Sequence, residues 1–329
     1  MIHTNGDKLP GRENRVASVT GRPALPRRLT AAIRALAADH RSGSARLALD
    51  ACGILAQCAP SAAGRRDDFH HHFHRDVARA VALAQPSMAA VWNACNRWLC
   101  NVQEGSTTQE AARQVERQLS QAHSAVASAA ARLVRSGSTV VTYSASSTVE
   151  AALLEARRRG RRFGVLCSEA RPMLEGRRLA LRLAASGLPV EFSTDAALPA
   201  LLRGSDLVLV GCDAILPGYF VNKVGTHALV RMARLQRVPV YLVADSFKFL
   251  TGEAARSFFM REENPDEVWK QSRKNLTIRN FYFEKIPLGL CSGIVTEWGT
   301  WLAKKVAAHM RRMKSDLSLR YAQKRGRGR

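Results

Sequence analysis

Through residues 29–135 the apolar positions recur at the spacing of amphipathic helices. In the first predicted helix they fall at i, i+4, i+7 and i+8, and a second helix repeats this pattern after the turn signal at 42–44. The positions are Leu29, Ile33, Leu36 and Ala37, then Leu47, Ala51, Ile54 and Leu55. Further helical stretches are predicted at 69–84, 87–101 and 108–135. This part of the chain is therefore predicted to be an all-helical unit.

The pattern changes near Gly137, where short runs rich in Val, Leu and Ile alternate with helical stretches. Strands are predicted at 139–143, 163–168, 190–193, 206–211, 238–244 and 292–296, and helices between them at 147–159, 176–185, 196–203 and 226–235. Near-continuous apolar strands that alternate with amphipathic helices are typical of a parallel sheet covered on both faces. The predicted fold class is therefore α/β, with a helical N-terminal domain followed by a Rossmann-like, mostly parallel sheet.

The sequence divides into four predicted parts. Residues 1–28 contain Gly, Pro, Asn and Arg without periodicity, which predicts a flexible arm. The helical domain covers 29–135 and the Rossmann-like domain covers 136–312. Residues 313–329 form a basic tail.

The composition favours a globular protein of the cytoplasm. The chain has 329 residues, of which 46% are hydrophobic, so it can bury a proper core. The richest apolar run, 207–216, carries Asp213 in its middle, and no run is long enough for a membrane span. The first residues lack the basic-then-apolar pattern of a signal peptide. Seven cysteines without a C-x-x-C pair favour free thiols over a disulfide framework.

The net charge of +23 predicts attraction to polyanions such as nucleic acid or phosphorylated metabolites. Much of it lies between Lys304 and Arg329, where ten Lys or Arg stand against one acid. The rest is spread over helix faces. Two interpretations of the tail stay open: non-specific contact with nucleic acid, or a disordered solubilising segment.

A histidine cluster is the one feature suggestive of a metal. It consists of His70, His71, His72 and His74. Only His70 and His74 share a helix face, and no carboxylate or cysteine completes a ligand set. A solvated helix start is therefore the preferred interpretation, and we expect neither a metal nor a cofactor.

Polar residues gather at four predicted strand ends. The carboxyl ends of parallel strands lie at one edge of the sheet, where ligands bind, so we expect these stretches to surround one crevice. The stretch 142–147 is rich in hydroxyls, which suits an anion or simple helix capping. The stretch 168–176 carries charges that salt bridges would explain equally well. The stretches 211–226 and 244–249 each supply an Asp and a Lys. No G-x-G-x-x-G or Walker loop occurs, which disfavours a nucleotide-binding Rossmann enzyme or a P-loop protein.

These stretches resemble a known family. The matching pieces, in order, are Thr-Tyr-Ser (142–144), Glu-Ala-Arg-Pro-x-x-x-Gly (169–176), Gly-Cys-Asp-Ala-Ile (211–215), Asn-Lys-Val-Gly-Thr (222–226) and Asp-Ser-Phe-Lys-Phe (245–249). They resemble the C-terminal domain of the translation initiation factor 2B alpha, beta and delta regulatory subunits. Methylthioribose-1-phosphate and ribose-1,5-bisphosphate isomerases share that domain. Weaker matches extend the resemblance over roughly residues 29–302.

The resemblance implies a homodimer formed through the C-terminal domain, and a cleft between the domains in which the isomerases bind a sugar phosphate. It implies that Asp213 stands where those enzymes have a catalytic aspartate. It also implies that Asn222 and Lys223 match their substrate-contacting pair.

Four departures argue against the isomerase reaction. The isomerases' catalytic cysteine is Ser144 here, and an alcohol is a far weaker acid than a thiol. A substrate arginine is replaced by Gln85. In the glycine turn that contains Gly43, the aligned arginine is a serine, with Arg41 one position early. A glutamine becomes Glu175, which would repel a phosphate unless paired.

Cys212 is a candidate substitute thiol beside Asp213. Neighbours on a strand point to opposite faces, so we expect Cys212 to face away from the crevice.

Three functions follow as hypotheses. The leading one is a protein that binds a phosphorylated sugar or nucleotide without turnover, with Arg171 or Arg41 as anion partners. The second is an aldose–ketose isomerase of a sugar 1-phosphate that uses Asp213, with Ser144 as a hydrogen-bonding group. The third is a translation-related regulatory subunit that contacts other proteins or RNA through its basic surface.

Overall fold

The computed structural model describes residues 25–58 and 68–313. The predicted N-terminal arm and basic tail lie almost entirely outside these residues, as do the side chains of His70 and His71. His74, which was predicted to belong to a solvated helix start, is instead buried edge-on against Trp98, with ring centroids 5.6 Å apart. No group of three or more His, Cys, Asp or Glu in the described part of the chain could hold a metal ion.

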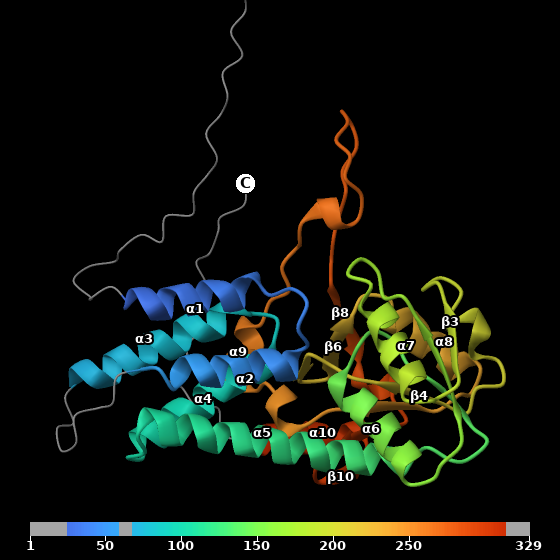
Figure 1. Ribbon diagram of the computed structural model, residues 1–329, viewed down its shortest axis with the longest axis horizontal. Helices are drawn as coiled ribbons and strands as arrows, with labels where there is room; N and C mark the ends of the chain where they lie inside the picture. Colours follow the sequence, from blue (N-terminus) through green and yellow to red (C-terminus); the bar gives the residue numbers. More distant parts are fainter. Residues whose placement is uncertain (1–24, 59–67, 314–329) are drawn as a thin grey trace, which may run out of the picture.

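Within residues 25–58 and 68–131, helices form the N-terminal half of the fold (Figure 1). They are α1 (Arg27–Ala38), α2 (Ser44–Leu55), α3 (Asp68–Ala84), α4 (Ala89–Gln103) and α5 (Thr108–Ala131). A capping box starts α5, because the Thr107 hydroxyl accepts the backbone N–H of Glu110 and the Glu110 carboxylate accepts that of Thr107. The apolar stripes of the helices pack around the fully buried Trp98.

A seven-stranded sheet forms the other half, in the order β10-β9-β7-β4-β1-β2-β3. Its strands are β1 (Thr139–Val141), β2 (Gly164–Ser168), β3 (Val190–Ser193), β4 (Leu207–Val210), β7 (Val240–Val243), β9 (Gly293–Thr296) and β10 (Gly299–Trp301). All neighbours run parallel except β10, which is antiparallel to β9.

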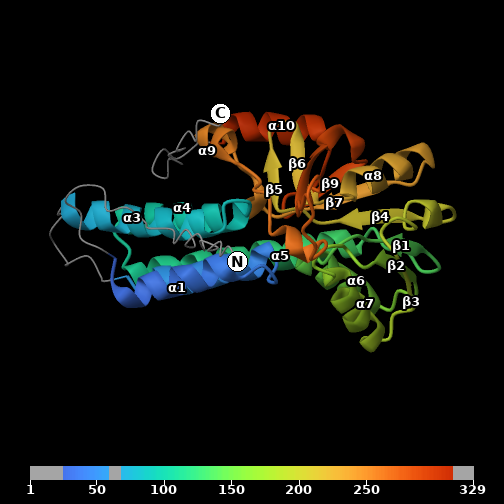
Figure 2. The same cartoon turned by 90° about the horizontal axis from the view of Figure 1, so that it is seen from above.

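Helices cover both faces of this sheet (Figure 2). One face is covered by α6 (Ser147–Arg158), α7 (Glu175–Ala185) and the end of α5, and the other by α8 (Thr226–Leu235) and α10 (Ala303–Arg312). Alternate strand residues enter opposite cores: Val140 packs with α6, while Val141 packs with α8. Since both faces are buried, the strands are apolar throughout, and the predicted α/β fold is confirmed.

Two predictions in this half are wrong. The helix expected at 196–203 is only a 3₁₀ turn, Ala200–Leu202, between Pro199 and Gly204. The stretch 211–226 was expected to be a loop leading into a helix, but it contains a β-hairpin, β5 (Ala214–Leu216) and β6 (Tyr219–Lys223). With β8 (Phe283–Pro287) these strands form a second, antiparallel sheet.

The core of the helical half and the core on one face of the sheet meet along α5. Its first half packs in the helical core through Val115 and Leu119, and its last turns pack against the sheet through Val126 and Ala130. The predicted division at residue 135 stays a prediction. Short elements complete the fold: η2 (Ser246–Lys248), α9 (Gly252–Ser257), η3 (Pro265–Glu267) and η4 (Leu288–Leu290).

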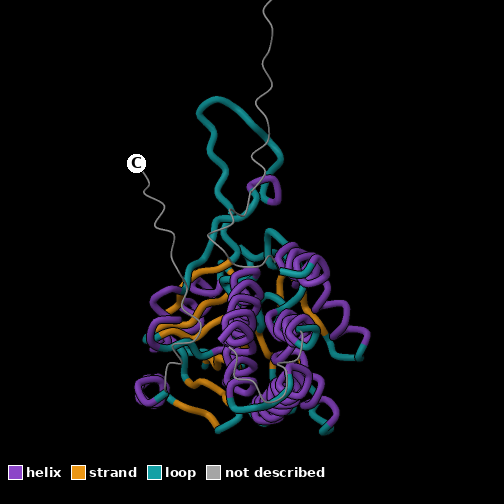
Figure 3. Tube along the Cα trace, turned by 90° about the vertical axis from the view of Figure 1, so that its left-hand side faces the viewer, coloured by secondary structure: helices purple, strands orange, loops and turns teal. Residues whose placement is uncertain are grey.

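One long loop stands away from the body. Residues 259–282, between α9 and β8, project above both halves in Figures 1 and 3. Over the described ranges, no helix combines the length and apolar character needed to cross a membrane.

Candidate functional site

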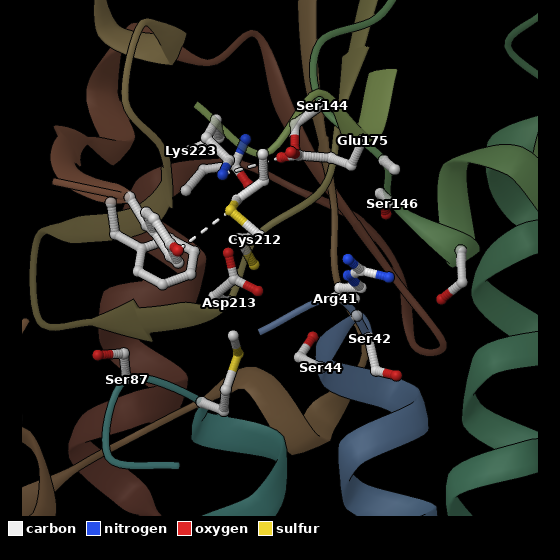
Figure 4. Close-up of a pocket in the computed structure, with 18 of the residues that line it drawn as sticks. Arg41, Ser42, Ser44, Ser87, Ser144, Ser146, Glu175, Cys212, Asp213 and Lys223 are labelled. Carbon is white, nitrogen blue, oxygen red and sulfur yellow. Dashed lines mark hydrogen bonds and ion pairs between the residues drawn. The ribbon is translucent and has the colours of Figure 1, made fainter. Parts of the chain in front are cut away.

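A cavity of about 300 Å³ lies where the helical half meets the carboxyl ends of the strands (Figure 4). The helical half lines it with residues 39–44 and 85–88, and the sheet half with residues 143–148, 212–213 and 222–223. All four predicted strand-end stretches thus reach it, since Glu175 of the stretch 168–176 and Lys248 of the stretch 244–249 also line it.

Asp213 is held in the cavity wall by its backbone. Its N–H donates to the carbonyl of Val221 (2.8 Å), and its carbonyl accepts the N–H of Ala89 (3.1 Å), so both halves of the fold fix it. Burial raises the pKa of the Asp213 carboxyl, while the ammonium groups of Lys248 and Lys223 oppose part of that rise. A raised pKa makes this carboxylate a stronger base than a solvent-exposed aspartate, which suits it to accept and return a proton.

Lys248 is a buried cation that the sequence analysis did not select as a site residue. It follows β7 in η2, and its ammonium group donates to the hydroxyl of Ser44 at the start of α2. The side-chain amide of Asn93 holds the carbonyls on either side, Phe247 at 2.8 Å and Phe249 at 2.9 Å. The strand-end motif Asp-Ser-Phe-Lys-Phe was the signal that could have identified it.

Glu175 gathers two of the predicted site residues. Its Oε1 accepts the Ser144 hydroxyl at 2.7 Å and the Lys223 ammonium at 2.9 Å, while its Oε2 has no hydrogen-bond partner. Gly176 permits this position, because a Cβ there would lie 1.8 Å from the Ser168 carbonyl oxygen. The ring of Tyr282 lies 4.8 Å from the Lys223 ammonium and completes its surroundings.

Asn222 and Gln85 line the cavity, but their amide groups are engaged within the protein. The Asn222 amide donates to the hydroxyl of Thr226 (3.0 Å). The Gln85 amide donates to the carbonyls of Leu36 (2.6 Å) and Asp39 (3.0 Å), and so holds the loop that precedes α2.

Arg171 does not reach the cavity. It is exposed after β2, and its guanidinium donates to the carbonyl of Val268 (2.9 Å) in the projecting loop. Arg41 and Gly43 do line the cavity. Figure 4 places Arg41 on the α2 side, across from Lys223.

Three further arginines line the cavity and were missed. Arg182 pairs with Glu150 (2.6 Å) and Arg261 with Glu263 (2.7 Å), whereas Arg178 makes no ion pair or hydrogen bond within the described ranges. Arg178 and Arg182 lie three and seven residues after Glu175 on α7, on one helix face. That spacing is a signal in the sequence that could have found them.

Cys212 lines the same cavity as Asp213, so the prediction that it faces away is wrong. The physical reason is that β4 ends at Val210, and strand alternation does not extend beyond it. Burial raises the pKa of the Cys212 thiol well above its ordinary value, and the nearby Lys248 opposes this only in part. The thiol is therefore protonated at neutral pH and is a poor nucleophile.

Two helix N-termini point at the cavity. The N-cap of α2 is Gly43, which has no side chain to satisfy the first N–H groups, and Ser44 lines the cavity behind it. The N-cap of α6 is Ser146, whose hydroxyl accepts the N–H of Val149 at 3.4 Å. Unsatisfied N–H groups and the helix dipole favour an anion at such ends.

The chain belongs to the initiation factor 2 subunit family, whose model matches residues 40–303. It is 31% identical to a putative translation initiation factor eIF-2B subunit 2-like protein of Pyrococcus horikoshii. The match spans 225 residues, which are 68% of this chain and 79% of that protein. It is 28% identical to a ribose 1,5-bisphosphate isomerase of Archaeoglobus fulgidus, over 78% of this chain and 84% of that enzyme.

A solved structure supports the same assignment. The crystal structure of translation initiation factor eIF-2B from P. horikoshii matches with a TM-score of 0.74 and 26% identity, over 86% of this chain and all of that one. The family resemblance seen in the motifs is thereby confirmed.

Proposed function

We propose that the cavity binds a phosphorylated sugar or nucleotide and does not isomerise it. The observation that carries this proposal is the pair of guanidinium groups of Arg41 and Arg178. Both line the cavity beside the N-termini of α2 and α6, and neither is paired within the described residues. Unpaired cations and free N–H groups around one concave site suit a phosphate dianion.

The cavity volume agrees with a small ligand. About 300 Å³ is at the lower end of the range for small-molecule sites and suits a sugar phosphate or nucleoside monophosphate. The mixed walls supply hydroxyls for sugar oxygens, among them Ser44, Ser87 and Ser146.

The absence of turnover follows from the groups around Ser144. Isomerisation between neighbouring carbons moves one proton between the carbons and another between their oxygens, which calls for two positioned acid/base groups. Asp213 can serve as one such group. Ser144 is an alcohol of very weak acidity whose hydroxyl donates to Glu175, and the Cys212 thiol stays protonated, so neither supplies the second group.

Binding is tested by isothermal titration of the full chain with ribose 1-phosphate, AMP and inorganic phosphate. We expect at least one phosphate ester to bind, and Arg178→Ala to weaken it about ten-fold. Arg177→Ala is the matched control, because Arg177 is the next residue on α7 but pairs with Glu169 (2.7 Å) outside the cavity. Equal losses in both variants, or no binding by the parent protein, would refute the proposal.

A second candidate function is a sugar-phosphate isomerase, and the raised pKa of Asp213 favours it. Asp213 would be the acid/base and Ser144 a hydrogen-bonding group. The test follows ribose 1-phosphate and ribose 1,5-bisphosphate by phosphorus NMR in the presence of the protein. Conversion that disappears in Asp213→Asn would establish the isomerase and overturn the binding-only proposal.

A further inference from the structure

The projecting loop, residues 259–282, is here named the arm (Figures 1 and 3). Its base touches the cavity through Arg261, Glu263 and Tyr282. Its outer part, residues 268–278, is named the tip. Every tip residue except Ile278 is exposed, so the tip takes no part in the cores of the molecule.

The arm is held firmly at its base. The Glu267 carboxylate accepts the hydroxyl of Tyr282 and the amide of the buried Asn280 (2.8 Å). The same amide donates to the carbonyl of Asn264 (2.7 Å), and the Asn280 carbonyl accepts the N–H of Glu263 (2.9 Å). Arg171 fixes the start of the tip through the Val268 carbonyl. A tip anchored in this way loses less conformational freedom when it binds a partner.

Charge is divided between base and tip. Three acids of the base are engaged, since Glu262 pairs with Arg279 (2.5 Å), Glu263 pairs with Arg261 (2.7 Å) and Glu267 accepts from Asn280, whereas the fourth, Asp266, is exposed. The tip contains no acid, and its charged residues are Lys270, Arg273 and Lys274. Among the described residues, none of these three cations has an ion-pair or hydrogen-bond partner for its side chain.

Trp269 directly precedes Lys270 in the chain, belongs to the same tip as the other two cations and is 57% exposed. A chain turn brings the tip together: Leu276 donates to the Arg273 carbonyl (3.2 Å), and Asn275 takes the left-handed conformation, φ 66°, that asparagine tolerates. Val268 and Leu276 are also exposed, at 37% and 40%. A large aromatic ring left in water on a fixed projection marks an interaction surface.

We propose that the tip of the arm binds single-stranded nucleic acid, with a base stacked on Trp269 and the adjoining phosphates on Lys270, Arg273 and Lys274. An exposed aromatic ring and three unpaired cations, on a tip that itself contains no acid, match what single strands offer, since each nucleotide has a flat base and one negative charge. An anionic membrane would require a broader apolar face than one ring and two partly exposed aliphatic side chains.

The test measures binding of the full chain to a labelled single-stranded RNA of about 12 nucleotides by fluorescence anisotropy over a salt series. We expect Trp269→Ala to weaken binding about ten-fold at every salt concentration, and Trp269→Phe to retain most of the affinity. The triple variant Lys270→Glu, Arg273→Glu, Lys274→Glu should reduce the slope of log K against log salt by about two.

A matched control separates the tip from the general positive charge. The triple variant Arg132→Glu, Arg135→Glu, Arg161→Glu makes the same change of charge at exposed arginines that no aromatic ring accompanies. It should leave the RNA affinity within about two-fold of the parent.

Three results would overturn the proposal. Equal losses in the two triple variants would mean that only net charge attracts RNA. Equal affinity for double-stranded RNA would exclude stacking on Trp269. Trp269-dependent binding to phosphatidylserine vesicles, without Trp269-dependent RNA binding, would assign the tip to a membrane surface.

Discussion

At the scale of single residues, Glu175 is the group that should most reduce the affinity of the cavity for an anion. It is the carboxylate that accepts both Ser144 and Lys223, and its second oxygen is buried without a partner. An incoming phosphate would compete with this carboxylate for the ammonium group of Lys223. The free protein is thereby stabilised at the expense of ligand affinity.

We therefore predict that Glu175→Gln increases the affinity for a phosphorylated ligand by about ten-fold, because a like charge is removed near the anion. The same change leaves a buried lysine without its carboxylate and should reduce the free energy of unfolding by about 3 kcal/mol. Titration calorimetry and urea denaturation measure the two effects. Glu169→Gln serves as control, since Glu169 pairs with Arg177 at the surface and should change unfolding by less than about 1 kcal/mol. A Glu175→Gln protein that binds no better than the parent would contradict the prediction.

The titration of Asp213 gives a second prediction. Its pKa is raised above the ordinary 3.8 by burial, so the carboxyl is neutral over a wider pH range and becomes an anion as pH rises through the raised value. Because that anion repels a phosphate, affinity should fall as pH rises through this range. Asp213→Asn should remove this component and leave only the titration of the ligand itself. Parallel profiles of affinity against pH in the two proteins would exclude a role for Asp213 in binding.

The motifs in the sequence predicted where the cavity lies. They did not predict which side chains enter it where residues close in the sequence point to different places. Asp213, Asn222 and Lys223 were placed at strand ends, and they line one cavity. Arg171 was grouped with them because it follows a strand, yet its side chain turns to Val268. The direction of the Arg171 side chain depends on the arm of residues 259–282, which lies nearly a hundred residues further along the chain and shows no periodic pattern of apolar residues.

At the scale of elements, the start of α2 is the sharpest feature of the cavity. Gly43 is its N-cap and contributes no side-chain acceptor, so the first N–H groups face the cavity. At this position the side chains of Ser, Thr, Asp and Asn stabilise a helix by accepting hydrogen bonds from its first N–H groups. Glycine cannot do so, and a bound anion would accept those hydrogen bonds instead.

We predict that Gly43→Asp stabilises the free protein by about 0.5 kcal/mol and abolishes anion binding, because the new carboxylate caps α2 and occupies the anion position. A Cβ at residue 43 meets nothing within 4 Å, so the substitution is sterically accepted. Gly43→Ala is the control: it adds the Cβ without an acceptor, and should lower stability slightly while anion binding persists. Thermal denaturation and phosphate titration measure both variants, and undiminished binding by Gly43→Asp would refute the assignment of this helix end.

Elements with one clear periodicity were predictable, and those built from mixed signals were not. The strands of the parallel sheet are apolar on both faces and were found within a few residues. The hairpin of β5 and β6 was missed because its residues were read only as ligand-binding groups. Its turn, Pro217-Gly218 with Gly218 at φ 86°, separates two short apolar runs and was a usable signal.

At the scale of the whole molecule, exposed apolar surface is distributed unevenly. Among the described residues, the three most exposed large apolar side chains are Leu235 (77%), Leu181 (71%) and Leu302 (66%), and all belong to the sheet half. Within the described part of the helical half, Leu83 (40%) is the only member of this exposed set. Apolar side chains left in water on one half favour association through that half.

We predict that the protein is a homodimer that associates through one side of its sheet half, either the α7 side with Leu181 or the α8 and α10 side with Leu235 and Leu302, because burial of exposed leucines removes apolar surface from water. Sedimentation equilibrium should give twice the chain mass of 36.1 kDa at micromolar concentration. Leu181→Asp, Leu235→Asp and Leu302→Asp, made separately, should include at least one variant that sediments as a monomer, since an aspartate inside the interface would be buried without a partner. Leu83→Asp is the matched control and should remain dimeric. A monomeric parent protein, or dissociation caused by Leu83→Asp alone, would show that the exposed leucines of the sheet half do not form the interface.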